Sequence, residues 1–319
     1  MTDKFDKKYS LLKAFEEELT VLAKYHKNLV VVNSDFTSRL GLSRFSEIFP
    51  ERQFNFGLAE QNAVGISVGL NIRGKIPMIC GFSNFSLGKA LEIIRDAICY
   101  PNLNIKFVAA GAGFGAAQEG ESYQSFEDIA FMRSLPNMKV FCAADVYETK
   151  AILRSMTDEY GPAYLRLTAE KCPIIHDENY DFKVGKIDVV KDGKDFFMFA
   201  AGPMLYRALE VADTLKNDGI DAGVANVSSI KPIDVAKIME ITAGAKLVAS
   251  IEDHNVFGGL GSAIAEVLAN TTGCKLKIIG IEDKFGKSGK LKDLYRDFGL
   301  DSTSIYENIK GFLKDNYID

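Results

Sequence analysis

Short hydrophobic runs alternate with longer amphipathic segments along most of the chain. In the first half, apolar runs rich in branched side chains and bounded by Pro, Gly or Asn predict strands at 29–33, 76–81, 105–110 and 138–142. The spacing of apolar residues between these runs predicts helices at 11–25, 59–73, 88–99, 125–134 and 146–160. Strands that are apolar on both faces and alternate with helices indicate a doubly wound parallel α/β sheet.

The alternation stops in a polar stretch at about residues 172–185 and then starts again. The second half predicts strands at 196–201, 222–226, 246–251 and 276–280, and helices at 204–218, 234–243 and 261–271. We therefore expect two α/β domains with mainly parallel sheets, at residues 1–178 and 179–319. The length of 319 residues agrees with this division, because domains average about 150 residues.

The composition excludes several classes of function. A net charge of −5 is too small and of the wrong sign for a nucleic-acid binder, and it does not favour an anionic membrane surface. No apolar run approaches the roughly 18 residues of a membrane helix, and the polar N-terminus does not read as a signal peptide. We expect a cytoplasmic protein that acts on small molecules, with neither nucleic acid nor membrane as a partner.

Cysteine and histidine are sparse and scattered. The five cysteines contain no C-x-x-C pair, and the three histidines are not at ligand spacing from one another. These patterns predict reduced thiols and no metal site made by this chain alone. Any chemistry must then come from carboxylates or from a bound cofactor.

The segment from Phe54 to Gly69 carries the most informative carboxylate. A strand end leads through Gly57 into a helix, which places Glu60 in the first helical turn at the C-terminal edge of the sheet, where open α/β sheets bind ligands. Glu60 could simply complement the helix dipole. Alternatively, it is a buried carboxylate with a raised pKa that exchanges a proton with a bound heterocycle. Gly65 and Gly69 would let the same helix pack closely against another element.

Other motifs allow both a structural and a functional interpretation. Phe82 and Phe85 follow a strand and are either core residues or a stacking surface for a planar ring. The glycines of segment 111–115 follow a strand but lack the G-x-G-x-x-G spacing, so a phosphate loop is poorly supported. Segment 258–262 could bind an anion at a helix N-terminus or serve tight packing. His254, beside two acidic residues, is interpreted as a hydrogen-bonded structural histidine.

Several sequence blocks together resemble the transketolase family. Blocks similar to its pyrimidine-binding domain are Phe56-Gly-Leu-Ala-Glu-Gln-Asn62, Phe82-Ser-Asn-Phe85 and segment 127–137. Blocks similar to its C-terminal domain are segments 161–167, 230–234, 252–254, 258–261 and 285–289. The blocks occur in the family's order over nearly the whole chain, so the chain resembles the C-terminal half of a split transketolase.

The resemblance implies thiamine diphosphate chemistry with Mg²⁺. A glutamate at the position of Glu60 contacts the aminopyrimidine ring in this family and exchanges a proton with it. The resemblance also implies that Phe82 and Phe85 cradle that ring and that Asp35 lines the same site. The implied reaction transfers a two-carbon ketol unit from a ketose to an aldehyde acceptor, with the cofactor as electron sink.

The family's Gly-Asp-Gly motif, which holds Mg²⁺ and the diphosphate, does not occur in this sequence. The resemblance therefore implies a separate N-terminal subunit that carries this motif, in an α₂β₂ heterotetramer. In that arrangement Mg²⁺ is held mainly by the partner subunit. This chain would supply half of each active site.

Two histidines and an arginine of the family pattern are replaced here by Gly111, Tyr123 and Ala169. In the family, one of these histidines and the arginine bind the substrate's terminal phosphate. Charged hydrogen bonds of this kind contribute roughly 1.5–3 kcal/mol each. We therefore expect an atypical substrate rather than a simple phosphosugar. The candidate substrate residues are Arg39, Glu119 and Tyr123, whereas Arg166 is interpreted as structural.

Three other protein classes are also compatible with parts of the sequence. The β subunit of a 2-oxo acid dehydrogenase shares the two-domain plan, but segment 127–133 favours a transketolase and an expected His-Ser-Gln sequence is missing. Deoxyxylulose-phosphate synthase is a closer relative, but it is normally one chain and keeps the histidine replaced by Tyr123. A non-catalytic or regulatory subunit on the same scaffold is the third class, and thiamine diphosphate content distinguishes it from the enzymes.

Overall fold

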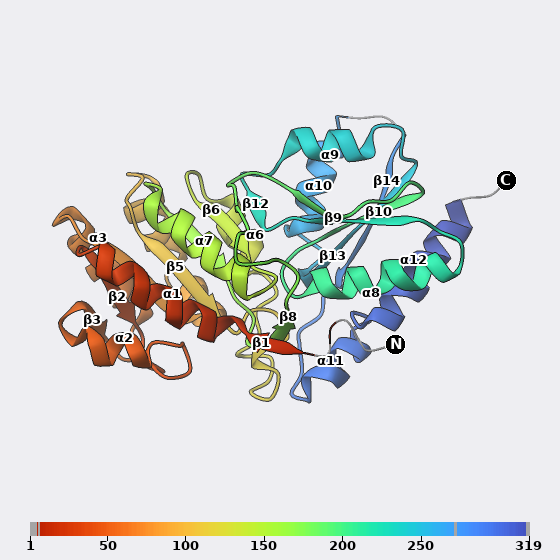
Figure 1. Cartoon of the computed structure of the whole chain (residues 1–319). Coiled ribbons are helices and arrows are strands. Elements are labelled where there is room, and N and C mark those ends of the chain that lie inside the picture. The colour runs from red at the N-terminus through yellow and green to blue at the C-terminus, as the bar shows by residue number, and fades with distance from the viewer. Residues whose placement is uncertain (1–4, 6, 271–272, 317–319) are drawn as a thin grey trace.

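Two sheets organise the chain, and helices cover both faces of each (Figure 1). The computed structural model describes residues 5, 7–270 and 273–316. The first unit is built on a seven-stranded sheet and the second on a five-stranded sheet. This arrangement confirms the predicted fold class of two α/β units with mainly parallel sheets.

The seven-stranded sheet has the order β12-β6-β7-β5-β4-β2-β3. All its strands from the first half of the chain run parallel. They are β2 (Leu29–Asn33), β3 (Gln53–Asn55), β4 (Ile76–Phe82), β5 (Lys106–Ala110), β6 (Lys139–Cys142) and β7 (Ala163–Arg166). The hydrophobic pattern did not predict β7, because this strand is only four residues long and includes Tyr164 and Arg166.

Alternate residues of each strand face opposite layers of helices. In β2, Val31 packs in a cluster with α1 (Leu11–Tyr25), α2 (Ser43–Ile48) and α7 (Val146–Asp158). Its neighbour Val32 packs with α3 (Glu60–Ile72) and α6 (Asp128–Ser134) on the other face. The predicted helix at 88–99 is instead divided into α4 (Ser83–Gly88), α5 (Leu91–Ile93) and a π-helical turn at Ile94–Cys99.

The five-stranded sheet has the order β14-β13-β10-β11-β9. Its parallel strands are β10 (Phe196–Ala200), β11 (Ala222–Asn226), β13 (Leu247–Asn255) and β14 (Lys275–Ile281), and β9 (Asp188–Lys191) is antiparallel. In Figure 1, α9 (Val235–Thr242) and α10 (Leu260–Leu268) lie above this sheet. On the opposite face are α8 (Met204–Asn217), α11 (Leu291–Asp297) and α12 (Ser302–Asn316).

The two units share structure across their boundary. Strand β12 (Ser229–Lys231), from the second half of the chain, pairs antiparallel with β6 at the edge of the first sheet. Near the N-terminus, β1 (Lys8–Ser10) pairs with β8 (Lys171–Pro173). The boundary predicted at residues 178 and 179 falls in the segment between β8 and β9.

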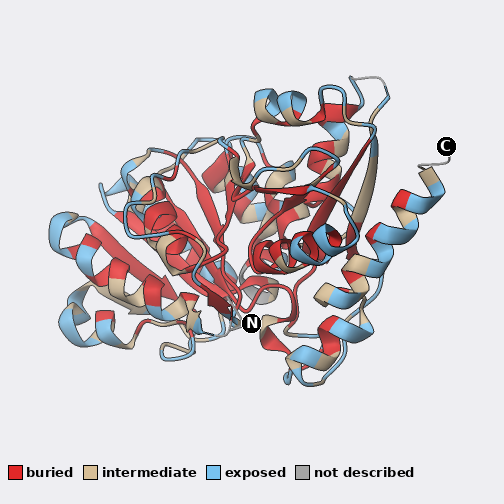
Figure 2. Ribbon diagram, turned by 45° about the vertical axis from the view of Figure 1, so that its right-hand side comes forward, coloured by how far each residue is buried: buried red, intermediate tan, exposed pale blue. Residues whose placement is uncertain are grey.

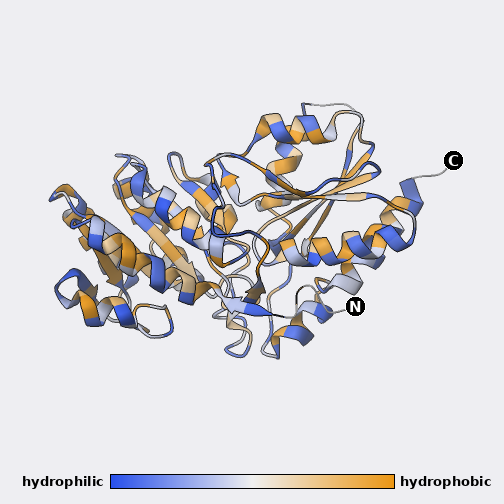
Figure 3. Ribbon diagram, in the orientation of Figure 1, coloured by the Kyte–Doolittle hydropathy of each residue, from blue (hydrophilic) through white to orange (hydrophobic). Residues whose placement is uncertain are grey.

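Burial and hydropathy follow the layered plan. Figure 2 shows buried strands inside both units and helices with one exposed side. Figure 3 shows the strands as mainly hydrophobic, whereas the helices carry both polar and apolar positions. Within the described ranges, no helix is both long and apolar enough to cross a lipid bilayer.

Candidate active site

The carboxyl ends of β2, β3, β4 and β5 meet at one edge of the first sheet, because these strands are parallel neighbours. The segments that follow these ends carry the residues predicted for the cofactor and substrate site. Ligands of open α/β sheets bind at this kind of edge. The described structure therefore brings the predicted residues to one side of the molecule.

The segment after β2 carries Asp35 in a left-handed conformation, with φ of 62°. The Asn33 side chain donates a hydrogen bond to the Asp35 carbonyl at 2.9 Å and accepts one from Gln53 at 3.0 Å. The Asn55 side-chain oxygen accepts from the backbone N–H groups of both Asp35 (2.9 Å) and Gly57 (3.0 Å). Asn55 thereby fixes the Asp35 turn relative to the segment that leads into α3, while the side chain of Asp35 remains exposed.

Glu60 is the first residue of α3 and is only 5% exposed. Its Oε2 atom lies 3.2 Å from the Lys89 Nζ atom, and the Gln61 side chain donates to the Lys89 carbonyl at 2.7 Å. A surface hollow of about 380 Å³ opens beside them, lined by residues 58–62 and Lys89. Glu60 thus lies at the positive end of a helix dipole and is also a buried carboxylate beside a surface hollow.

Aromatic and charged side chains from two loops and from the end of β4 form a cluster at the same edge. Phe82, the last residue of β4, makes edge-on contacts with Phe36 (ring centroids 5.3 Å apart) and Tyr123 (5.8 Å). The Arg39 guanidinium lies 5.4 Å from the Phe82 ring centroid and forms an ion pair with Glu119. Arg39 and Tyr123 therefore lie beside the Phe82 ring, and Glu119 joins the cluster through its ion pair with Arg39.

Sequence reasoning missed two residues of this region. Phe36 packs against Phe82, and the Arg39 guanidinium lies 5.9 Å from the centroid of the Phe36 ring. Lys89 is the ion-pair partner of Glu60. Neither belongs to a recognisable local motif. The predicted Phe85 lies in α4, but its side chain is outside the part that the structure describes.

The glycine-rich segment 111–115 is packed against protein rather than open to a phosphate. Gly111 has φ of 71°, and a Cβ atom there would lie 3.1 Å from the Phe82 ring. A Cβ atom on Gly113 would lie 2.0 Å from a carboxylate oxygen of Asp253. The glycines of this segment therefore serve close packing, in agreement with the poor support for a phosphate loop in the sequence.

Arg166 is the centre of a buried polar network behind the site. It is 1% exposed and forms ion pairs with Asp128 of α6, at 2.9 Å, and with Asp253 of β13. The Tyr164 hydroxyl donates a hydrogen bond to the same Asp128 carboxylate at 2.5 Å. This network links the two units, which agrees with a structural role for Arg166.

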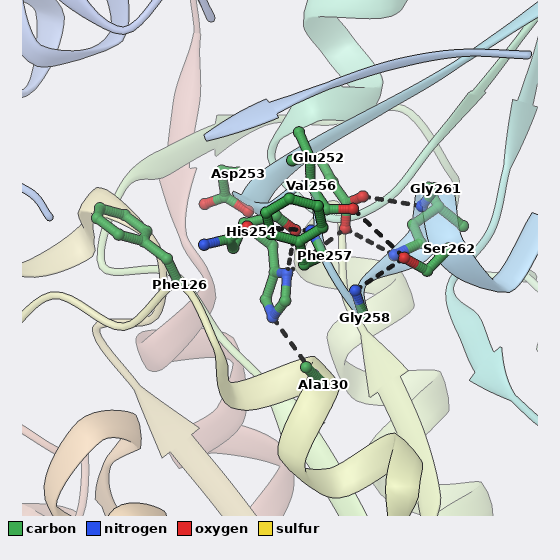
Figure 4. A network of polar contacts seen from close by, with 12 residues as sticks. Phe126, Ala130, Glu252, Asp253, His254, Val256, Phe257, Gly258, Gly261 and Ser262 are labelled. Carbon is green, nitrogen blue, oxygen red and sulfur yellow. Dashed lines mark hydrogen bonds and ion pairs between the residues drawn. The ribbon is translucent and has the colours of Figure 1, made fainter. Parts of the chain in front are cut away.

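His254 is held as a neutral ring at the boundary between the two units (Figure 4). Its Nδ1 atom donates to the Asn255 carbonyl at 2.7 Å, and its Nε2 atom accepts from the Ala130 N–H at 3.3 Å. Burial lowers the pKa of His254 to about 4. The histidine is therefore structural, as its sequence neighbours indicated.

The N-terminus of α10 already holds a carboxylate. Glu252 accepts hydrogen bonds from the backbone N–H groups of Leu260 (2.6 Å) and Gly261 (2.8 Å). Figure 4 shows the Glu252 carboxylate facing Gly261. A Cβ atom on Gly259 would lie 2.0 Å from a Glu252 oxygen. These glycines serve tight packing, and the anion-site interpretation of segment 258–262 is wrong because Glu252 occupies that position.

The cysteines are free, and four of them are buried. Burial raises the pKa of Cys80 well above its usual range. Among the described residues, no group of three His, Cys, Asp or Glu side chains could hold a metal ion.

Comparisons with known proteins agree with this architecture. Residues 7–173 match the family described as "Transketolase, pyrimidine binding domain", and residues 185–305 match "Transketolase, C-terminal domain". A protein of Methanocaldococcus jannaschii named "Putative transketolase C-terminal section" is 42% identical over 95% of this chain and 96% of its own length. A protein of Actinobacillus succinogenes, named as one subunit of an apulose-4-phosphate transketolase, is 33% identical over 88% of this chain and 91% of its own length.

Solved structures extend the comparison. One described as "Split gene transketolase, inactive beta4 tetramer" is 37% identical, covers 97% of this chain and 100% of its own, and superposes with a TM-score of 0.88. The transketolase of Campylobacter jejuni shares the fold, with a TM-score of 0.83 at 21% identity, and the match covers 97% of this chain and 48% of that protein. The chain therefore belongs to the transketolase family, of which it carries the pyrimidine-binding and C-terminal domains.

Proposed function

We propose that this chain is the C-terminal subunit of a split transketolase that transfers a two-carbon ketol unit from a ketose to an aldehyde. The observation that carries the proposal is the buried Glu60 carboxylate at the same sheet edge as the Phe82 ring. A carboxylate beside an aromatic ring is suited to a planar, protonatable heterocycle. Two relatives are named as a section or a subunit of a transketolase, which supports the same assignment.

These residues fit the pyrimidine half of thiamine diphosphate. The bound cofactor supplies the electron sink for breaking and forming the carbon–carbon bond. Glu60 would hold and exchange a proton at the pyrimidine ring, and Phe82 would pack against that ring. The candidate residue Asp35 lies at the same edge, beside Phe36.

A partner subunit is part of the proposal. The Gly-Asp-Gly motif that holds Mg²⁺ and the diphosphate in this family does not occur in this sequence, so we assign both to an N-terminal subunit that carries the motif. On α3, a Cβ atom at Gly65 or Gly69 would meet nothing within 4 Å in this chain. Within the described chain, no other element therefore packs closely against α3 at these glycines. A second subunit that packs against this face of α3, in an α₂β₂ assembly, would make the expected close contact.

We propose an atypical ketose as the substrate. One relative is named a transketolase subunit for apulose 4-phosphate, and one of Clostridium sp. is named for 6-deoxy-6-sulfo-D-fructose, at 32% identity over 87% of this chain. Arg39 is the charged residue that would meet the far end of a sugar, and it is already paired with Glu119. This pairing and the replacements at Gly111, Tyr123 and Ala169 favour a substrate other than a simple phosphosugar.

Native mass spectrometry of the chain captured from its own cells with Mg²⁺ and thiamine diphosphate tests the assembly. The expected species is a heteromer with a Gly-Asp-Gly partner and about one thiamine diphosphate per pair of subunits. A cofactor-free homo-oligomer without such a partner would favour a non-catalytic subunit instead.

Steady-state assays of the complete enzyme test the substrate. We expect poor turnover of xylulose 5-phosphate with ribose 5-phosphate and better turnover with modified ketoses. Turnover of the pentose phosphates at the level of an ordinary transketolase would overturn the proposal of an atypical substrate.

A further inference from the structure

A loop of the first unit is tied at both ends to a segment of the second unit. We propose that segment 286–289 of the second unit positions loop 117–124, which carries Glu119 and Tyr123, for substrate binding. The kinetic consequence rests on the proposed transketolase function, but the structural role does not.

Three hydrogen bonds join the loop to the segment. The Ser288 hydroxyl donates to the Gln118 carbonyl at 2.6 Å, and the Gly289 N–H donates to the Ala117 carbonyl at 3.1 Å. At the other end of the loop, the Gln124 side chain donates to the Lys287 carbonyl at 3.0 Å. These contacts hold the beginning and the end of the loop against a segment more than 160 positions away in sequence.

Gln124 packs closely against segment 286–289. Gln124 is a polar residue but only 3% exposed. A Cβ atom on Gly286 would lie 1.6 Å from its side-chain oxygen. Because Gln124 is enclosed by protein, even an alanine at position 286 would displace its amide from Lys287.

The loop itself contains no helix or strand. It lies between a short 3-10 turn, Phe114–Ala116, and α6. Inside it, the Tyr123 and Gln124 N–H groups both donate to the Gly120 carbonyl, at 3.1 and 3.3 Å, and the Gln124 side chain donates to the Ala117 carbonyl at 3.5 Å. From α4, the Asn84 side chain donates to the Ser122 carbonyl at 2.6 Å. Because the internal bonds involve only Ala117, Gly120, Tyr123 and Gln124, the position of the loop also depends on contacts with the rest of the molecule.

The proposed cofactor residues and the proposed substrate residues are therefore held in place by different parts of the molecule. Glu60 and Phe82 are held by elements of the first sheet. Glu119 and Tyr123 are held partly by the second unit, through segment 286–289. A change in that segment should weaken the binding of sugars and leave the binding of thiamine diphosphate intact.

The test compares Ser288→Ala with the conservative Ser288→Thr, which keeps the hydroxyl. Ser134→Ala is the matched control, because Ser134 is also exposed and donates to a backbone carbonyl, Phe131, at 2.8 Å. Hydrogen exchange of amides 117–124 in the complete enzyme should become about fivefold faster in Ser288→Ala and stay unchanged in the other two variants. Gly286→Ala, which displaces Gln124, should accelerate the hydrogen exchange of these amides further. Unchanged exchange in both Ser288→Ala and Gly286→Ala would overturn the proposal.

The kinetic test uses the same variants. In Ser288→Ala, KM for the ketose should rise about fivefold, with kcat and the affinity for thiamine diphosphate within about twofold of the unmodified enzyme. Faster exchange with an unchanged KM would overturn the role in substrate binding. A complete enzyme without any ketol transfer would instead overturn the proposed function, and hydrogen exchange would still decide whether the segment holds the loop.

Discussion

At the scale of single residues, the site depends on charged groups that are held by specific neighbours. A buried carboxylate is costly unless it is paired or hydrogen-bonded. Glu60 meets this requirement through Lys89, whose backbone is itself held by Gln61. Arg39 is paired with Glu119 and stacked over aromatic rings.

Glu60→Gln keeps the size of the side chain and removes its ability to exchange a proton. We expect the chain to fold and to assemble, while ketol transfer by the complete enzyme falls about 100-fold or more. Steady-state kinetics measure the loss, and circular dichroism checks the fold. Glu92→Gln, on the exposed face of α5, is the matched control and should retain turnover. Full activity in Glu60→Gln would remove this residue from the mechanism.

Arg39→Lys keeps the charge but loses the planar group that lies over Phe36 and Phe82. We expect KM for the sugar substrate to rise about three- to tenfold, with the affinity for thiamine diphosphate unchanged. Arg95→Lys is the control, since Arg95 is also exposed and paired with an acidic residue, Asp96. Equal effects of the two substitutions on KM would argue against a substrate role for Arg39.

At the scale of elements, the segment between β8 and β9 is anchored to α7. His176 lies 3.0 Å from a carboxylate oxygen of Asp145, which caps α7, and 3.5 Å from one of Asp188. Burial opposes charging of the ring, but the hydrogen bond to Asp145 and the nearby carboxylates of Asp188 and Glu148 outweigh it and raise the pKa of His176 to about 10.

This anchoring predicts a pH dependence of stability. Because the folded-state pKa of His176 lies above its unfolded value near 6.5, the stabilisation is complete below about pH 6.5 and is lost as the pH rises through about 10. At pH 6, His176→Gln should lower the free energy of unfolding by on the order of 2–4 kcal/mol. Urea unfolding at pH 6, 8 and 10 should show this difference shrinking with pH. A difference that stays constant over this range would contradict the charged histidine.

At the scale of the whole molecule, the two units behave as one packed body. Strand β12 completes the first sheet, and one hydrophobic cluster includes residues of both sheets, among them Phe107 and Phe199. The Arg166 network adds buried charges at the same boundary. The boundary is therefore a core rather than a flexible hinge.

Arg166→Met should show how much this boundary contributes to stability. Without the guanidinium, the carboxylates of Asp128 and Asp253 lose their counter-charge in a buried site, so unfolding should become easier by about 3–5 kcal/mol. Chemical denaturation measures the change, and Arg44→Met, at an exposed position, should have little effect. A change below about 1 kcal/mol would mean that the network is not a significant stabilising contact.

Local patterns predicted much of the fold but little of the site's geometry. The predicted strand at 29–33 and helix at 11–25 match β2 and α1, because β2 is a short continuous apolar run and α1 keeps a helical hydrophobic period. Strand β7 was missed because its four residues include Tyr164 and Arg166, and β12 was missed because it has only three residues, two of them polar. Among the site residues, Phe36 and Lys89 were missed because their partners lie far along the chain.

By itself, the sequence determined the alternation of strands and helices, the presence of two α/β units, and the position of Glu60 at a sheet edge. These follow from hydrophobic periods and strand ends, which are local properties of the chain. Only the tertiary structure decided that Arg39 meets Glu119, 80 positions away, and that Ser288 holds the loop at Gln118, 170 positions away. The packing of the whole molecule determines such contacts, because no local period relates residues so far apart.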